Sequence, residues 1–303
     1  MIESIPNVSE GQRPAVLEAL TAALRAVPGL RLLDTTADPA HHRSVFTYAG
    51  DAETVAHAAV ALVATAIALI DLRLHRGVHP RLGAVDVLPF VPLEGSTLDA
   101  CVTLARRVGA TLADRFNLPV YLYEAAASRP ERRRLEDVRR GQFEGLLTRM
   151  ADPAWAPDFG PAQPHPTAGA IAVGARRPLV AYNVNLASDR LDVARAIAAR
   201  IRERNGGLPC VKALGLPLAD RGIVQVSMNL TDFTITPPAV AFEAVRQQAA
   251  QYGVSVRESE LIGLIPRAAL AGTTAEAIGL VGFRDDQVLE TRLAMTPPNP
   301  PPP

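Results

Sequence analysis

The stretch HRGVHPRLGAVDVLPFVP, from His75 to Pro92, places a turn with two glycines directly before an apolar segment. The segment from Ala84 to Pro92 is dominated by valine and other apolar residues, a composition typical of a β-strand. Its prolines indicate that the strand lies at a sheet edge or ends there. The turn sets His79 directly ahead of Pro80, a combination that a strand alone does not need.

This strand completes a series of elements that begins at the N-terminus. Apolar periodicity predicts strand, helix, strand, strand, helix and strand over residues 2–5, 14–27, 30–36, 43–50, 51–72 and 84–92. This β-α-β-β-α-β order is the ferredoxin-like arrangement. A further helix and strand, over residues 97–116 and 119–124, extend it.

A second series follows a segment that interrupts all periodic structure. Residues 155–169, WAPDFGPAQPHPTAG, contain four prolines and two glycines, which predicts a linker. After a strand in AIAVGAR, the β-α-β-β-α-β order returns. We therefore predict an α/β protein (an α+β sandwich) with two ferredoxin-like subdomains, residues 1–165 and 166–290, and a cleft between them. Residues 291–303, rich in proline, are predicted to be disordered.

The sequence also predicts whether two further segments are buried or exposed to solvent. The apolar run from Val55 to Leu72 contains His57 and is flanked by charges, so we predict a buried amphipathic helix capped by Asp51 and no membrane span. The stretch ERRRLEDVRRGQFEGLLTRM, residues 131–150, alternates arginine with acidic residues. This pattern predicts a helical stretch with a solvated charged face.

The balance of charge excludes several classes of protein. The 303 residues carry 31 basic and 31 acidic side chains, so no overall field favours nucleic acid or a membrane surface.

Cys101 and Cys210 have no metal-like spacing and fit a reducing compartment. The first residues show no basic region followed by an apolar one, so we expect no signal peptide and a cytoplasmic protein.

His79 is the strongest candidate for proton transfer. Pro80 restricts it to extended backbone geometry, so its position is better defined than that of an ordinary loop histidine. A neutral imidazole with a pKa of about 6.5 can accept and return a proton near neutral pH. From the residues alone, a histidine that only hydrogen-bonds the backbone of a tight turn fits equally well.

Other polar residues in apolar surroundings are candidates for substrate binding. Arg81 can hold an anionic group through two parallel hydrogen bonds, or can be a surface residue. Asp86 lies in an apolar strand and needs a partner, so a structural ion pair and a site role both fit. Asparagines inside strand patterns indicate ligand recognition at Asn183, Asn185 and Asn229.

Neither a metal site nor a nucleotide-binding loop is expected. His41, His42 and His75 lack the spacing of a zinc motif. The sequence has no phosphate loop and no GxSxG serine motif.

Several blocks of the sequence, taken in order, resemble the glutamate formiminotransferase (glutamate formimidoyltransferase) family, folate-dependent enzymes of histidine breakdown and one-carbon metabolism. These blocks are PNVSEG, RSVFTYAG, LIDLRLHRGVHPRLGAVDVLPFVP, PVYLYEAAA, WAPDFGP, VGAR, LVAYNVNL, QVSMNLTDF and LIGLIP. The resemblance implies transfer of a formimino group from N-formimino-L-glutamate to N5 of tetrahydrofolate by a cytoplasmic homodimer, with the folate in a tunnel between the subdomains and no metal. It also implies that ring closure needs another protein, because the chain has no room for the cyclodeaminase domain of some relatives.

The resemblance assigns roles to residues of this sequence. The essential histidine of the family falls on His79. Beside these assignments, the residues expected to bind substrate are Asn7, Arg43, Arg81, Asp86, Asn183, Asn185 and Asn229. The folate-contacting loop falls on the predicted linker, that is on Gly160, Pro161, Ala162, Gln163, Pro164, His165, Pro166, Thr167, Ala168 and Gly169.

Two positions depart from the family pattern. Val78 stands where a glutamate commonly precedes the histidine, and Thr36 stands where the family commonly has a catalytic aspartate. A formimino group is largely cationic at neutral pH, so nearby carboxylates would stabilise it. Because side chains alternate along a strand, we expect Asp34 and Asp38, on the same face as Thr36, to supply the charge as catalytic residues.

The departures leave two alternatives open. One is a folate-dependent transferase that uses a neutral formyl donor on the same scaffold. The other is a folate-binding homologue that has lost catalysis.

Overall fold

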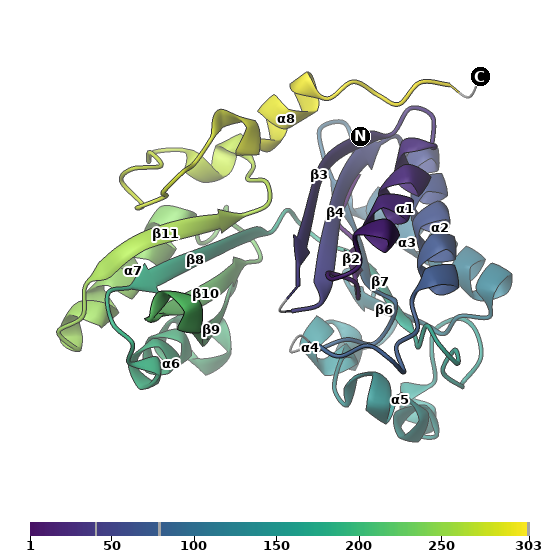
Figure 1. Cartoon of the computed structure of the whole chain (residues 1–303), viewed down its shortest axis with the longest axis horizontal. Helices are drawn as coiled ribbons and strands as arrows, with labels where there is room; N and C mark the ends of the chain where they lie inside the picture. The colour runs from purple at the N-terminus through teal and green to yellow at the C-terminus, as the bar shows by residue number, and fades with distance from the viewer. Residues whose placement is uncertain (40, 78–79, 302–303) are drawn as a thin grey trace. The chain divides into compact units, whose positions relative to one another are not determined.

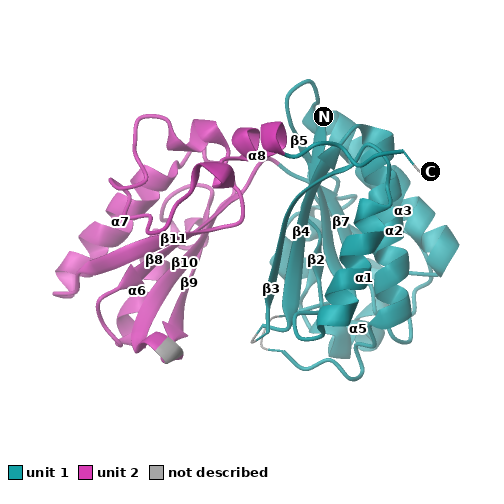
Figure 2. Cartoon of the chain, turned by 45° about the horizontal axis from the view of Figure 1, so that its top comes forward, with its two compact units in different colours: residues 1–176, 296–303 teal, residues 177–295 magenta. Residues whose placement is uncertain are grey.

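The computed structural model describes residues 1–39, 41–77 and 80–301, and only the backbone of Asp220. The chain divides into two units, one of Met1–Arg176 with the C-terminal segment from Thr296 and one of Arg177–Met295 (Figure 2). Each unit has its own sheet, its own helices and its own apolar core. The prediction of an α/β protein is confirmed.

Unit 1 is built on one seven-stranded sheet in which Pro6 interrupts the first strand. Its strands are β1 (Ile2–Ser4), β2 (Asn7–Val8), β3 (Arg31–Asp38), β4 (Arg43–Gly50), β5 (Val85–Pro92), β6 (Val120–Glu124) and β7 (Ile171–Ala175). Both β1 and β2 pair antiparallel with β4 on one side and β5 on the other. β3 extends the sheet beyond β4, and β7 and β6 extend it beyond β5 in parallel pairing.

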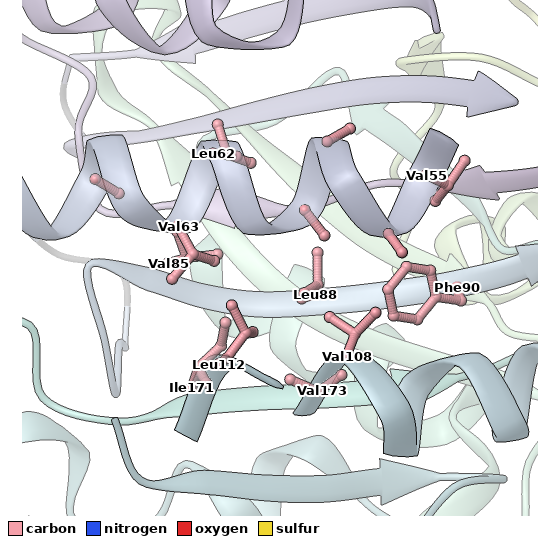
Figure 3. Packing of buried hydrophobic residues seen from close by; sticks show 14 of the residues in the cluster. Val55, Leu62, Val63, Val85, Leu88, Phe90, Val108, Leu112, Ile171 and Val173 are labelled. Carbon is pink, nitrogen blue, oxygen red and sulfur yellow. The ribbon is translucent and has the colours of Figure 1, made fainter. Parts of the chain in front are cut away.

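Three helices of unit 1 cover one face of this sheet (Figure 1): α1 (Pro14–Arg25), α2 (Ala52–Leu69) and α3 (Leu98–Phe116). Asp51 caps α2 as predicted, because its carboxylate accepts a hydrogen bond from the Thr54 amide at 2.8 Å. By length and composition alone α2 is apolar enough to cross a membrane. In unit 1, however, it packs against α1, α3 and the sheet, with Val63 beside Val85 of β5 (Figure 3). The predicted buried helix is confirmed.

The opposite face of β5, β6 and β7 is covered by the segment predicted to be charged and solvated. It forms a 3₁₀ turn (Pro130–Arg132) and two short helices, α4 (Leu135–Val138) and α5 (Gln142–Met150). Val138, Leu146 and Met150 join the apolar cluster on this face. Arg132 is 1% exposed and pairs with Asp158 at 2.7 Å, so the solvated face was a wrong prediction for this arginine.

Unit 2 repeats the β-α-β-β-α-β order of elements. They are β8 (Val180–Leu186), α6 (Leu191–Ile201), β9 (Val211–Leu218), β10 (Ile223–Leu230), α7 (Pro238–Gln251) and β11 (Val256–Ile262), followed by α8 (Leu289–Met295). The strands are antiparallel in the order β11-β8-β10-β9. The antiparallel part of the unit 1 sheet has the corresponding order: β5, then β1 with β2, then β4 and β3.

The division between the units lies after Arg176, whereas the sequence predicted a boundary after residue 165. The difference is β7, the strand in AIAVGAR. It pairs with β5 and β6 and therefore belongs to unit 1. Local composition marks the irregular segment before β7, but pairing with strands far away in sequence decides which unit the strand joins.

The C-terminal segment, predicted to be disordered, groups with unit 1 from Thr296 onward and contacts it through Asn299. Nδ2 of Asn299 donates to the carbonyl oxygens of Leu24 and Val27 at 3.0 and 2.9 Å, just at the end of α1. The Gly29 amide donates to the Asn299 carbonyl at 3.0 Å, and the Asn299 amide donates to the Leu30 carbonyl at 2.8 Å. These contacts satisfy carbonyl groups that the end of a helix leaves without intrahelical partners.

Asn299→Ala removes both side-chain hydrogen bonds at the end of α1. We expect the free energy of unfolding to fall by about 1–2 kcal/mol, measured by urea denaturation. Pro298→Ala changes an exposed neighbour and should stay within about 0.5 kcal/mol of the parent. Equal stability of the two variants would contradict a capping role for Asn299.

Candidate active site

The turn before β5 carries the strongest candidate from the sequence. Val78 and His79 lie outside the described residues, so the role of His79 stays a prediction. On either side of them, His75 is 5% exposed and Arg81 is 6% exposed. His75 and Arg81 are therefore buried in unit 1, whereas Arg76, Gly77 and Pro80, which lie between them, are exposed.

The predicted folate loop, residues 160–169, is hydrogen-bonded to both flanks of this turn. The Leu72 amide donates to the Thr167 carbonyl oxygen at 2.8 Å, and the Ala84 amide donates to the Ala168 carbonyl oxygen at 3.0 Å. Gly169 has a φ of +71°, and an added Cβ there would collide with the Leu82 carbonyl oxygen. The fold thus brings the loop and the flanks of the turn side by side.

His165 fixes the shape of the folate loop from within. Its backbone exchanges hydrogen bonds with Gly169 at 2.8 and 3.0 Å. Its Nδ1 accepts from the amides of Thr167 and Ala168 at 3.4 and 3.1 Å. Burial lowers the pKa of His165 below its ordinary value, which keeps the ring neutral and Nδ1 free to accept.

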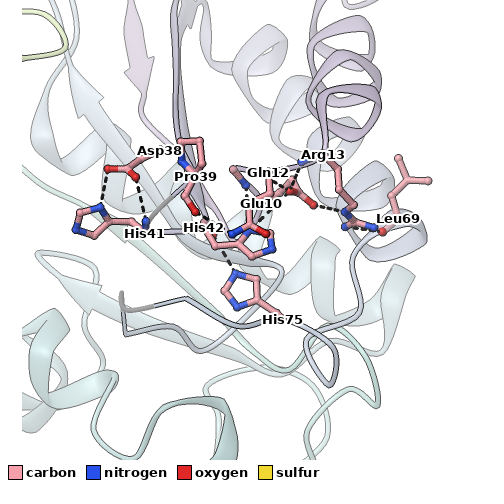
Figure 4. A network of polar contacts seen from close by, with 10 residues as sticks. Glu10, Gln12, Arg13, Asp38, Pro39, His41, His42, Leu69 and His75 are labelled. Atoms are coloured by element: carbon pink, nitrogen blue, oxygen red, sulfur yellow. Dashed lines mark hydrogen bonds and ion pairs between the residues drawn. The ribbon is translucent and has the colours of Figure 1, made fainter. Parts of the chain in front are cut away.

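Two histidines stack at the start of the turn (Figure 4). The ring centroids of His42 and His75 lie 4.1 Å apart, with 29° between the ring planes. The Gly11 amide donates to Nδ1 of His42 at 3.1 Å, and Nε2 of His75 donates to the His42 carbonyl oxygen at 2.9 Å. Burial lowers the pKa of both histidines, so neither ring adds a positive charge at neutral pH.

Glu10 anchors the other side of this stack and was missed by the sequence reasoning. Its fully buried carboxylate accepts from the Gln12 and Arg13 amides at 2.8 and 2.9 Å and pairs with Nε of Arg13 at 2.5 Å. Burial raises the pKa of Glu10, but these hydrogen bonds outweigh burial and lower it. The available signal was a carboxylate within the block PNVSEG, close before an arginine.

Asp86 is the centre of a buried ion-pair cluster. Its carboxylate accepts from Nη1 of Arg43 at 2.9 Å, from Nη2 of Arg139 at 2.5 Å and from the Leu82 amide at 2.7 Å. Arg43 also donates from Nε and Nη2 to Oδ1 of Asn7, at 3.1 and 2.8 Å. The fold therefore joins three predicted substrate-binding residues. It adds Arg139, which the charge pattern had assigned to a solvated face.

The electrostatics of the cluster keep its members charged. Burial raises the pKa of Asp86, but Arg139, Arg43 and the Leu82 amide lower it to about 2. Burial lowers the pKa of Arg43 to about 10, against the attraction of Asp86. The ion pair that the sequence left open for Asp86 is thus confirmed.

Arg81 is a buried residue, so the surface alternative is wrong. Its guanidinium donates to both carboxylate oxygens of Glu144, at 2.7 and 3.2 Å. The Phe143 amide donates to the Arg81 carbonyl oxygen at 2.8 Å, which ties the turn to α5. An anionic substrate group would have to compete with Glu144 for this guanidinium.

Asp34 and Asp38 lie on β3, where a bulge separates Leu32 from Asp34. From Asp34 to Asp38 the pairing with β4 is regular, so both residues share the face of Thr36. The exposed Asp38 carboxylate accepts from the His41 amide at 2.9 Å and lies 2.5 Å from Nδ1 of His41. These contacts do not test a catalytic role for Asp34 or Asp38, which stays a prediction.

The three candidate asparagines of unit 2 differ in environment. Asn185 is fully buried, donates to Glu258 and Glu260 at 3.1 and 2.7 Å, and accepts from Gln225 at 2.9 Å. Oδ1 of Asn183 accepts from the backbone amide of Met228 at 3.3 Å, whereas Asn229 is exposed. The Asn185 amide is thus engaged within its own sheet, and ligand recognition by these residues stays a prediction.

Comparison with known proteins gives the relationship of the whole chain. Residues 1–176 match the formiminotransferase domain, N-terminal subdomain, and residues 181–277 match the formiminotransferase domain. The chain belongs to the formiminotransferase family. Two relatives match this chain almost from end to end. The glutamate formimidoyltransferase of Streptococcus pyogenes serotype M1 is 45% identical over 97% of this chain and 98% of the relative. The glutamate formimidoyltransferase of Thermoplasma acidophilum is 41% identical over 97% of this chain and 97% of the relative.

Fused relatives are longer than this formiminotransferase. The formimidoyltransferase-cyclodeaminase of Rattus norvegicus is 40% identical over 91% of this chain, but only 52% of the rat protein is covered. Within residues 1–39, 41–77 and 80–301, no group of three His, Cys, Asp or Glu side chains is placed to hold a metal ion. Metal-free chemistry stays a prediction.

Asp86→Asn leaves two guanidiniums of this formiminotransferase without their shared counter-charge. We expect a loss of roughly 3–5 kcal/mol in the free energy of unfolding at pH 7, measured by denaturant titration. Because folding lowers the pKa of Asp86 from about 3.9 to about 2, its stabilisation is complete above the unfolded value and is lost as pH falls through 2. The difference between parent and variant should therefore shrink at low pH.

Asp99→Asn, in the exposed first turn of α3, is the matched control for this variant. It should cost no more than about 1 kcal/mol. If Asp86→Asn were no less stable than Asp99→Asn at pH 7, the cluster would not support the fold.

Proposed function

We propose that this chain transfers the formimino group of N-formimino-L-glutamate to N5 of tetrahydrofolate. The observation that carries the proposal is the match over nearly the full length of glutamate formimidoyltransferases from two distant organisms. The hydrogen bonds between the flanks of the His79 turn and the predicted folate loop support it, because the reaction needs folate beside the proton-transfer group.

His79 is the general acid and base in this proposal. N5 of the folate attacks the amidine carbon, and the imidazole takes the proton that N5 loses. The same imidazole returns that proton to the departing nitrogen of glutamate as the old C–N bond breaks. Proton transfer of this kind contributes about 10²–10⁴ in rate.

Carboxylates near the reacting carbon stabilise the cationic amidine. Val78 and Thr36 supply none, so the proposal assigns this charge to Asp38, with Asp34 on the same strand face. In support, Asp38 is exposed and ionisable, and regular pairing of β3 from Asp34 onward keeps both residues on the face of Thr36.

The proposal includes the wider setting of the reaction. Both units share one order of elements and of antiparallel strands, which supports two ferredoxin-like subdomains. The folate tunnel between them, the homodimer, the cytoplasmic location and the absence of a metal are expectations from the family. Val78 and Thr36 leave both alternatives open, a neutral formyl donor and a folate-binding homologue without catalysis.

His79→Ala should lower kcat with N-formimino-L-glutamate and tetrahydrofolate by about 10²-fold or more, in a steady-state assay. His57→Ala, on the exposed side of α2, is the matched control and should keep full activity. Tetrahydrofolate binding, measured by calorimetry, should be unchanged in both variants. Equal turnover in the two variants would remove His79 from the mechanism.

The same assay separates the alternatives. Turnover of N-formyl-L-glutamate alone would establish a formyl donor, and folate binding without turnover of either donor would indicate a binding protein.

Asp38→Asn should reduce kcat/KM for the formimino donor by roughly tenfold or more, because a hydrogen bond to a charged group contributes about 1.5–3 kcal/mol. A neutral formyl donor, if it is used, should be affected less. Asp99→Asn serves again as the control, since it lies on the exposed end of α3. An unchanged kcat/KM in Asp38→Asn and in Asp34→Asn would show that neither carboxylate replaces the missing ones.

A further inference from the structure

The Asp86 cluster contains more positive than negative charge. Two guanidiniums, from Arg43 and Arg139, share one carboxylate, and the remaining member, Asn7, is neutral. The side chains of Arg43 and Arg139 are only 11% and 16% exposed. A positive charge held in a largely buried place without its own partner is costly, so the cluster suits a further anion.

The unused hydrogen-bonding capacity of the cluster lies on Arg139. Nε, Nη1 and Nη2 of Arg43 all donate to Asn7 or Asp86. Among the described residues, Arg139 donates only from Nη2, and its buried Nε has no partner there. A guanidinium offers five N–H donors in a planar fork that matches a carboxylate.

Arg139 is also held in place before any ligand arrives. The guanidinium of Arg149 donates to the carbonyl oxygens of Asp137, Val138 and Arg140, on both sides of Arg139. Arg149 in turn lies over the ring of Trp155, 3.4 Å from its centroid. Fixing the backbone on both sides of an arginine reduces the entropy lost on binding.

We propose that Arg139 binds a carboxylate of the donor substrate, with Asp86 and Arg43 as its positioning partners; this rests on the proposed function. Asp86 accepts from the Leu82 amide, so the cluster is tied directly to the turn that follows His79. The donor bears its carboxylates close to the reacting amidine. The glutamyl tail of folate also bears carboxylates, but the aminobenzoyl group separates it from N5.

Arg139→Gln should raise KM for N-formimino-L-glutamate by roughly 10- to 100-fold with little change in kcat. The decisive comparison uses two donor analogues in which either the α- or the γ-carboxylate is a carboxamide. The parent enzyme should discriminate against one of them, and Arg139→Gln should lose that discrimination. Arg133→Gln, an exposed arginine of the same segment, should behave as the parent.

Calorimetric titration tests the proposal without turnover. Arg139→Gln should bind N-formimino-L-glutamate roughly 10-fold or more weakly and tetrahydrofolate as tightly as the parent. Weaker binding of tetrahydrofolate alone would assign Arg139 to the folate tail and overturn the proposal. Parent-like binding of both ligands would overturn it as well. Arg139→Lys, which keeps the charge but not the fork, covers the case in which Arg139→Gln does not fold, and it should also lose donor discrimination.

The outcomes also separate this proposal from the proposed function. A parent enzyme that turns over no formimino donor contradicts the proposed function, whatever the variants do. Turnover in the parent that is unaltered in Arg139→Gln contradicts only the role of Arg139.

Discussion

The buried carboxylate of Asp86 is the constraint on which the described part of unit 1 depends most. It neutralises two guanidiniums and caps the Leu82 amide, so it joins β4, β5 and the segment between α4 and α5 to the turn before β5. Its own burial would favour the neutral acid, and only the combined contacts keep it ionised. A buried carboxylate with several charged partners fixes the directions of all of them, which is what a binding site requires.

The turn and the predicted folate loop depend on each other through their backbones. The amides of Leu72 and Ala84 donate hydrogen bonds to carbonyl groups of the loop, and Gly83 forms a β-bridge with Gly169. A Cβ on either glycine would collide with a carbonyl oxygen of the opposite segment. These backbone hydrogen bonds join the two irregular segments without the use of side chains.

Local sequence patterns predicted the helices and strands well, because apolar periodicity and capping residues indicate them directly. The order β-α-β-β-α-β in each half, the buried helix α2 and its cap at Asp51 all followed from neighbouring residues. The unit boundary and the C-terminal segment did not follow. The pairing of β7 and the bonds of Asn299 to the end of α1 both join residues far apart in sequence.

Neighbouring residues along the chain specify the helices and strands and their order, and motif blocks indicate the family to which the chain belongs. Tertiary structure alone decided which charges meet. Arg43 and Arg139 reach Asp86 across 43 and 53 residues, and Arg81 reaches Glu144 across 63. The sequence did not distinguish Arg139 from its solvated neighbours, because a charge pattern gives only the sign and the spacing of the charges along a predicted helix. Which arginine is buried depends on the sheet that the helix covers, and that is a property of the folded chain.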